Sequence, residues 1–262
     1  MKLYILLAIS LIALSGCSKD NETHNPVVNS YPMNVGSEWN YTRQIIIEKY
    51  ASDTSNIIID RDTIDMLLNV QIEKDTILND TLHVKVFKTY DNYANSITYE
   101  YKSLDQEGLK YYGNQYISLN NNPKKRSRYN ISSLKNNLSS SSAKEIFLEK
   151  QALLELKLPL FLNSTWVCRF PLTIYTPKIT KTVIAAETIN IAEHTMECFK
   201  IDWSYNNHPD YDGTKTTEWY SSSGLVKKQT TIDRIAFTNE NGDIIYYGSF
   251  SETITLQSFT IK

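Results

Sequence analysis

The sequence has few of the residues from which catalytic and metal sites are usually built. Its 262 residues include only four histidines and three cysteines. They form no H-E-x-x-H or C-x-x-C pattern, and the chain has no G-x-S-x-G turn and no glycine-rich phosphate loop. We therefore expect no metal, no cofactor and no catalytic residue, and these absences argue against an enzyme.

The sequence also lacks an excess of either charge. Lysine and arginine number 27 and aspartate and glutamate 29, which gives a formal net charge of −2. A chain with this balance has no electrostatic reason to bind nucleic acid. Eight glycines and seven prolines are too few for a low-complexity or collagen-like protein.

The beginning of the chain has the pattern of a secretory signal. A basic Met1-Lys2 precedes an apolar run over Leu3–Leu14, which is too short to span a bilayer. The following L-S-G-C resembles a bacterial lipobox, which implies that residues 1–16 are a signal peptide and that acyl chains such as palmitate anchor Cys17 in a membrane. The alternative is an ordinary signal peptide with a chance cysteine. We expect a lipid-anchored protein of the cell envelope.

The next residues have little to bury. Residues 17–30 combine this cysteine with a polar stretch that predicts a flexible tether of about 20 Å. Asp20 and Glu22 resemble acidic export signals of such lipoproteins, which favours the outer membrane and leaves its face open.

Most of the remaining chain alternates apolar and polar residues with a period of two. Trp39, Tyr41, Ile45 and Ile47 share one parity, which is typical of half-buried antiparallel strands. The pattern predicts a mainly β fold, a large curved antiparallel sheet or half-barrel built from two similar modules, with one short helix. Further strands are expected at Leu82–Val86, Thr63–Glu73, Ile97–Ser103, Leu109–Ser118, Thr182–Ile191, Cys198–Tyr205, Thr216–Tyr220, Leu225–Ile232 and Ile244–Ile261, with turns at Gly108, Gly113, Gly213, Gly224 and Asn239–Gly242.

A repeated motif divides the β-rich domain, residues 31–262, into halves 31–120 and 159–262. The segments P-M-N-V-G-S-E-W-N-Y and P-L-F-L-N-S-T-W-V-C place Pro, Ser and Trp at the same spacing. In each, a residue that tolerates positive φ precedes a Trp that opens an alternating run. These positions are Gly36 and Trp39 in the first copy, and Asn163 and Trp166 in the second.

The segment that joins the halves, residues 121–158, predicts a loop and a helix. Asn120–Ser142 is rich in Asn, Ser, Lys and Arg, as exposed loops are. Ala143–Leu158 is the one stretch that favours a helix, because Ser142 and Glu145 can form a capping box before an apolar run.

Several segments together resemble a family of Bacteroidota-type envelope lipoproteins of unassigned function. The W-Y-x-x-x-G-L-V-K hairpin at Trp219–Lys227 is the most specific, and the others are the two repeat copies and M-E-C-F-K-I at Met196–Ile201. These motifs specify packing and turns, so the resemblance implies a fold with Trp39, Trp166 and Trp219 as structural anchors. More distantly, the pattern is similar to the curved sheet of lipoprotein-carrier domains (LolA and LolB), which implies a cradle for acyl chains.

Two cysteines follow Cys17. In regular strands, Cys168 would share a face with Trp166, whereas Cys198 would lie opposite Phe199 and Ile201. A β-bulge would restore the pairing, so both a Cys168–Cys198 disulfide and two buried thiols stay open.

Three Asp-Thr-aliphatic tripeptides lie close together. They resemble the acceptor sequence of an envelope O-glycosylation system, which makes Thr63, Thr76 and Thr81 candidate acceptors. The alternative is that Asp-Thr simply begins a strand. Three other patterns could belong to functional sites: Tyr99 and Tyr101 could stack on a sugar, Lys124–Arg128 could bind an anion, and Asp210–Gly213 resembles half of a calcium loop. Each also has an ordinary structural explanation, as strand tyrosines, a solvated loop and a β-turn respectively.

Two functional hypotheses remain. The first is a non-enzymatic structural or binding module for a protein or glycan partner, and a solid core that contains Trp39, Trp166, Trp203 and Trp219 would favour it. The second is a carrier or sensor of a lipid or other hydrophobic ligand, which requires an apolar cavity that the side chains do not fill.

Overall fold

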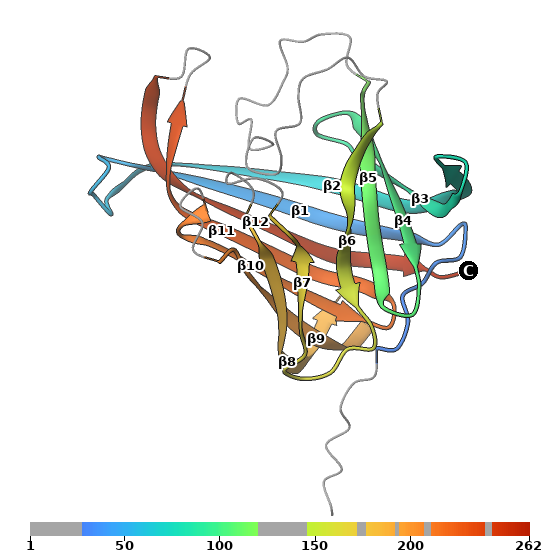
Figure 1. Cartoon of the computed structure of the whole chain (residues 1–262). Helices are drawn as coiled ribbons and strands as arrows, with labels where there is room; N and C mark the ends of the chain where they lie inside the picture. The colour runs from blue at the N-terminus through green and yellow to red at the C-terminus, as the bar shows by residue number, and fades with distance from the viewer. Residues whose placement is uncertain (1–27, 120–145, 172–176, 192–193, 207–210, 239–242) are drawn as a thin grey trace, which may run out of the picture.

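The structure is a computed structural model that describes residues 28–119, 146–171, 177–191, 194–206, 211–238 and 243–262. Within these ranges, twelve strands form one antiparallel sheet in the order β6-β5-β4-β3-β2-β1-β12-β11-β10-β9-β8-β7 (Figure 1). No helix in this part of the chain is long and apolar enough to cross a membrane. The strands are β1 (Glu38–Tyr50), β2 (Ile58–Leu78), β3 (Leu82–Asp91), β4 (Ser96–Leu104), β5 (Gly108–Ser118), β6 (Phe147–Lys157), β7 (Thr165–Arg169), β8 (Ile179–Ile191), β9 (His194–Ser204), β10 (Thr214–Ser221), β11 (Gly224–Thr238) and β12 (Ile244–Thr260).

The sheet curls into a nearly closed, barrel-like shape. Most strands pair with their neighbours in the chain, and the first strand also pairs with the last, from Glu38 opposite Thr260 to Lys49 opposite Gly248. β6 and β7 stand at the two ends of the strand order, yet they approach each other, and the indole of Trp166 donates a hydrogen bond of 3.0 Å to the carbonyl of Leu154. The curved antiparallel sheet expected from the alternation is thus confirmed.

The period of two decides which side chains face the concave side of the sheet. In β1, Trp39, Tyr41, Ile45 and Ile47 are all buried, as their shared parity predicts. Polar neighbours such as Gln44 point to the opposite face and are exposed. The sequence therefore specifies the register of this strand, because a slip by one residue would expose its entire apolar set.

Both copies of the repeated motif begin a strand as expected. Gly36 has a φ of 88° and Asn163 a φ of 65°, so each occupies the left-handed region just before a strand. Trp39 and Trp166 are the second residues of β1 and β7, and both side chains are buried. The two copies therefore open the first strands of the two six-strand halves of the sheet order.

The segment that precedes β1 fills the space between these halves. Val28 is buried in one core cluster, and Tyr31 packs against that cluster and a second one. The Tyr31 ring centroid lies 6.2 Å from that of Trp39, 6.3 Å from that of Phe87 in β3 and 6.5 Å from that of Tyr220 in β10. This segment acts as an aromatic plug inside the sheet.

The expected helix is wrong where the structure describes it. Residues 147–157 form β6, whose Leu156 is fully buried and lies opposite Leu109 of β5. The Leu154 carbonyl, which an α-helix would pair within itself, instead accepts the Trp166 indole N–H. Tertiary pairing overrides the local pattern here, and the proposed capping box and the entire Asn120–Ser142 loop lie outside the described residues.

Gly113 is not a turn, in contrast to Gly108, Gly213 and Gly224. It lies inside β5 at a shift in register, with a φ of 153°. A Cβ at this position would lie 2.1 Å from the carbonyl oxygen of Phe147 in β6. The missing side chain is what allows β6 to approach β5. The Asn239–Gly242 turn falls outside the described residues.

The replacement Gly113→Ala should therefore destabilise the protein. We expect a loss of about 2 to 3 kcal/mol in the free energy of unfolding, because the methyl group must displace backbone. Urea unfolding followed by circular dichroism measures the change. Ser118→Ala, at an exposed position of the same strand, is the control and should change stability by less than about 0.5 kcal/mol. Equal stability of both variants would contradict the close-approach argument.

Candidate functional site

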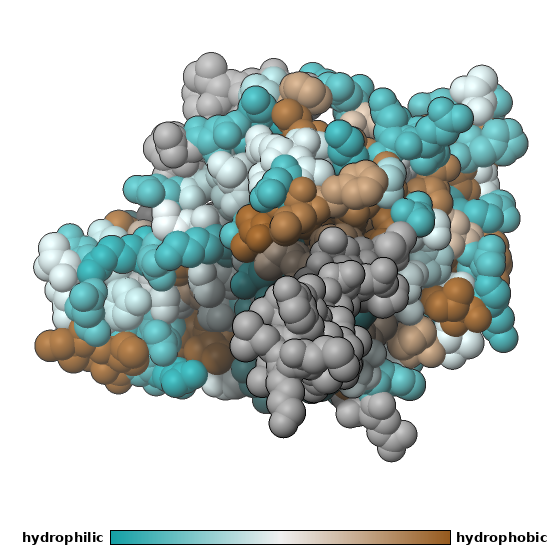
Figure 2. All heavy atoms as spheres, turned by 90° about the horizontal axis from the view of Figure 1, so that it is seen from below, coloured by the Kyte–Doolittle hydropathy of each residue, from teal (hydrophilic) through white to brown (hydrophobic). Residues whose placement is uncertain are grey.

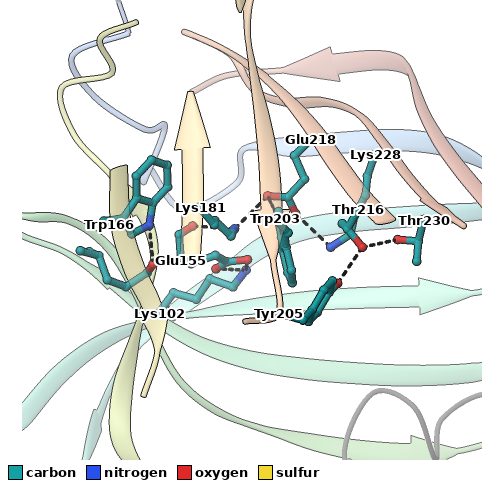
Figure 3. Close-up of polar contacts among 11 residues, drawn as sticks. Lys102, Glu155, Trp166, Lys181, Trp203, Tyr205, Thr216, Glu218, Lys228 and Thr230 are labelled. Atoms are coloured by element: carbon teal, nitrogen blue, oxygen red, sulfur yellow. Dashed lines mark hydrogen bonds and ion pairs between the residues drawn. The ribbon is translucent and has the colours of Figure 1, made fainter. Parts of the chain in front are cut away.

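The concave side of the sheet holds a buried ion cluster formed by Lys181, Glu218 and Lys228 (Figure 3). The Lys181 Nζ lies 2.8 Å from Glu218 Oε2, and the Lys228 Nζ lies 2.9 Å from Glu218 Oε1. The Lys181 side chain is 0% exposed and that of Glu218 is 3% exposed. The Lys228 side chain is 19% exposed, so each carboxylate oxygen faces one ammonium group largely away from water.

Alternation along the strands puts these charges inside. Lys181 in β8 lies between Ile179 and Val183, which share its parity and are buried. Glu218 in β10 is directly opposite Lys228 in β11. Three strands therefore hold the cluster in a fixed register, and the charges are part of the core rather than of a mobile loop.

Trp203 completes the cluster. Its indole Nε1 donates a 3.0 Å hydrogen bond to Glu218 Oε2, and the ammonium groups of Lys181 and Lys228 lie 4.3 and 4.5 Å from its ring centroid. The ring thus takes part in two cation–π contacts while it holds the shared carboxylate. Beside the cluster, the Tyr205 ring centroid lies 6.2 Å from that of Trp203, and hydroxyl contacts join Tyr205, Thr216 and Thr230.

A second group of charges, formed by residues of β4 and β6, lies next to the ion cluster. The Lys102 Nζ is 2.8 Å from a carboxylate oxygen of Glu155 and 3.1 Å from one of Glu100. Lys181 also donates a 2.8 Å hydrogen bond to the backbone carbonyl of Glu155. Farther along the concave side, Arg43 donates to Glu252 at 2.6 Å and pairs with Asp91. Ion pairs on the concave side therefore connect strands that are distant in the sequence, such as β4 with β6 and β1 with β12.

The electrostatics of the ion cluster keep Glu218 and Lys228 in their charged forms. Burial alone would raise the pKa of Glu218, but Lys181 and Lys228 outweigh it and lower this pKa to about 2. Burial would lower the pKa of Lys228, but Glu218 raises it above its usual value. A carboxylate that holds three donors and stays ionised near neutral pH is a poor general acid or base. The arrangement can organise the core and is not suited to proton transfer.

Side chains also close the junction between β6 and β7. In addition to the Trp166 contact, Arg169 in β7 donates to Glu149 in β6 at 2.8 Å, and both side chains are largely buried. The hollow beside this pair has a volume of about 10 Å³, which is scarcely enough for one water molecule.

A shallow groove lies on the convex face. It has a volume of about 510 Å³ and crosses β12, β1 and β2. Six of its eight lining residues are polar, and Gln44 donates a 2.9 Å hydrogen bond to Asp65 within it. None of its lining residues is aromatic, so the groove offers no ring on which a sugar could stack. The eight lining residues are Thr42, Gln44, Asp65, Met66, Leu67, Asn92, Thr253 and Thr255.

The end of the β1–β2 hairpin exposes three consecutive isoleucines, Ile57–Ile59, which we call the isoleucine tip. Their exposed fractions are 69%, 49% and 64%. Arg234 of β11, at a bulge with a φ of 55°, donates to the backbone carbonyl of Asp53 and, at 2.5 Å, to Asn56 Oδ1. The tip is therefore held by a neighbouring hairpin.

The structure places the predicted acceptor threonines on β2 and its turn. Thr63 and Thr81 are exposed, whereas Thr76 is half-buried opposite Val84. The proposed lipidation site Cys17 and the basic run Lys124–Arg128 lie outside the described residues. No group of three or more His, Cys, Asp or Glu side chains in the described ranges is arranged to hold a metal ion.

The disulfide between Cys168 and Cys198 is not formed. Both are free, buried thiols, and they belong to different core clusters. Burial raises the pKa of both thiols, that of Cys198 to about 12. The bulge that would have restored the pairing does not bring them together, so both act as small core residues.

The three predicted anchors are all buried, but in different surroundings. Trp39 and Trp166 lie inside the sheet and donate to the carbonyls of Ser223 and Leu154. Trp219 packs with Cys198, and its ring faces Lys200 and Lys227 at 5.3 and 4.9 Å. The fourth tryptophan, Trp203, belongs to the ion cluster.

The expectation from sequence missed the ion cluster. A signal was present, because Lys181 occupies an inward parity between Ile179 and Val183, and Glu218 shares its parity with Tyr220. A charge on the apolar parity of a strand needs a buried partner. The partner itself could not be identified, because it depends on the register between strands.

No protein-family model, curated protein or solved structure matches this chain. The candidate site is therefore described by its own geometry alone.

The replacement Glu218→Gln should strongly destabilise the protein. It leaves the ammonium groups of Lys181 and Lys228 inside the sheet without a counter-charge, and we expect a loss of about 3 kcal/mol in the free energy of unfolding. Chemical unfolding measures it. The control is Asp75→Asn, which breaks the exposed pair with Lys85 and should cost less than about 0.5 kcal/mol. Similar losses in both variants would show that the buried ion pairs of Glu218 contribute no more to the free energy of unfolding than an exposed pair does.

The same carboxylate should make stability depend on pH. Its pKa is about 2 in the folded chain and about 4.5 normally, so its contribution is complete above pH 4.5 and is lost as the pH falls towards 2. We expect the stability difference between wild type and Glu218→Gln to be on the order of 3 kcal/mol at neutral pH and to shrink through this window. Urea unfolding at a series of pH values tests this. A difference that stays constant down to about pH 2 would contradict the assignment.

Proposed function

We propose that this chain is a lipid-anchored protein of the cell envelope whose β-sheet is a non-enzymatic module that binds a protein partner. The observation that carries the proposal is the isoleucine tip. Three large apolar side chains are exposed together on a hairpin that Arg234 holds in place. Exposed apolar side chains on a fixed support are typical of a surface that a partner covers.

The surroundings of the tip support a protein partner rather than a glycan. Charged side chains of β1 and β2 flank the isoleucines. Lys49 pairs with Asp60 and Asp62, and Arg61 approaches Glu48. An apolar centre with a charged rim is the usual anatomy of a protein interface. Isoleucine offers neither the flat ring nor the hydrogen bonds by which sugars are held.

The alternative function, a carrier of a lipid, has less support. The ion cluster and the pair of Arg43 with Glu252 put charges on the concave side, where an acyl chain would have to lie. Contact with an acyl chain would cost these charges further solvation. The Tyr31 plug also occupies the space between the two halves of the sheet.

The envelope location and the anchor are proposed from the sequence. The lipobox-like L-S-G-C and the apolar run before it support acylation at Cys17, and the acidic residues after it favour the outer membrane. A tether from Cys17, which was expected over residues 17–30 and enters the core at Val28, would then keep the surface that binds a partner near a membrane.

The test is capture of a partner from solubilised membranes by the purified full-length chain. Mass spectrometry identifies the protein that wild type captures. We expect Ile59→Glu to capture at least tenfold less of it, because a charge at a buried contact costs more than about 1.4 kcal/mol of binding free energy. The matched control is Ile77→Glu, at an exposed isoleucine near the far end of β2, which should retain the partner.

Three outcomes would count against the proposal. Equal capture by both variants would remove the tip as the interface. A lipid recovered from the purified protein by organic extraction, in equimolar amount, would favour the carrier. A Cys17→Ser variant that stays in the membrane fraction would contradict the lipid anchor.

A further inference from the structure

The connection between β6 and β7 exposes two large apolar side chains. Phe161 is 61% exposed and Leu162 is 52% exposed, whereas the neighbouring Leu158 and Leu160 are buried. Hydrophobic surface gathers near the middle of this end of the molecule when it is viewed from below (Figure 2). The loop thus divides its apolar residues between the core and the outside.

The loop is held rigidly in this arrangement. The backbone N–H of Asn163 donates to the carbonyl of Val183 at 2.8 Å, and the N–H of Val183 donates to the carbonyl of Ser164 at 2.9 Å. The backbone N–H of Ser164 in turn donates to the carbonyl of Phe161 at 3.0 Å. The next residue of β8, Ile184, is 42% exposed and extends the apolar character of this end. The two exposed side chains are therefore presented on a fixed backbone.

The same loop is bound to the segment through which the chain reaches its N-terminus. The N–H of Leu160 donates a 3.1 Å hydrogen bond to the carbonyl of Val28, so the tether joins the sheet one residue away from Phe161. Cys17 precedes Val28 by eleven positions. Such a stretch spans about 18 Å as a coil and about 38 Å when fully extended.

We propose that Phe161 and Leu162 insert into the interfacial layer of the membrane that holds the lipid anchor. This inference rests on the proposed acylation of Cys17, which would keep this end within reach of the headgroups. A tether alone restricts distance and leaves orientation free. Two apolar side chains that enter the boundary between headgroups and acyl chains would also fix which end of the sheet faces the lipid.

A bilayer is favoured over a protein as the occupant because the tether leads directly to it. Phe161 and Leu162 are two neighbouring apolar side chains one residue from the point where the tether joins the sheet. They are sufficient to orient a molecule that is already bound to the membrane by acyl chains, because the anchor supplies the affinity. The isoleucine tip belongs to a different hairpin, that of β1 and β2, which projects to the side of the sheet in Figure 1.

The experiment places an environment-sensitive NBD fluorophore on the full-length, acylated chain in phosphatidylcholine vesicles. The label is attached through Phe161→Cys or Leu162→Cys, and through Ile59→Cys as the matched control at an exposed apolar position. Cys168 and Cys198 are buried and free and should not react in the folded protein. We expect at least a twofold rise in emission on vesicle binding and quenching by nitroxide lipids at positions 161 and 162, and neither change at position 59.

The outcomes separate this inference from the proposed function. A chain that floats with the vesicles but shows the same emission at positions 161 and 59 overturns the insertion of the loop and leaves the anchor intact. Stronger quenching at position 59 reverses the proposed orientation. A chain that does not float with vesicles overturns the anchor, and the insertion of Phe161 and Leu162 with it.

Discussion

The pairing of β1 with β12 is the interaction on which the rest of the sheet depends. It joins the two six-strand halves through a ladder from Glu38 and Thr260 to Lys49 and Gly248. Without it, each half would be an open sheet with one apolar face in water. Because the ladder brings the halves together, their concave sides face each other, and the Tyr31 plug and the ion cluster can be buried between them.

The closed interior has a consequence for function. A sheet of this kind that is lined by apolar residues could hold a lipid, but here Lys181, Glu218 and Trp203 satisfy one another in the space such a ligand would need. The contacts among these charges require one register of the three strands that carry them. In the function that we propose, recognition falls to the outside of the molecule, where the isoleucine tip and the loop of Phe161 and Leu162 expose apolar side chains.

Much of the fold could be predicted from local sequence. The parity of apolar residues identified most strands, and the residues before Trp39 and Trp166 indicated left-handed conformations that the structure confirms. The helix expected before Pro159 was wrong because a run of leucines is compatible with both periods, and contact with β5 and Trp166 decided between them. Gly113 was misassigned to a turn because nothing local indicates that another strand's carbonyl lies 2.1 Å from its missing Cβ. The ion cluster was missed for the same reason, since the partner of a buried charge lies on another strand.

The position of the first and last strands also sets an order of events during synthesis. Asn40 and Ser258, which share a hydrogen bond, are 218 positions apart, so β1 must wait for nearly the whole chain before it finds β12. Contacts of such separation form slowly, because the chain must close a long loop before they stabilise it. The junction of β6 with β7 can form early, whereas the centre of the sheet is completed last. A chain built in this way cannot complete its sheet until β12 is available, which would suit the export to the envelope that we propose.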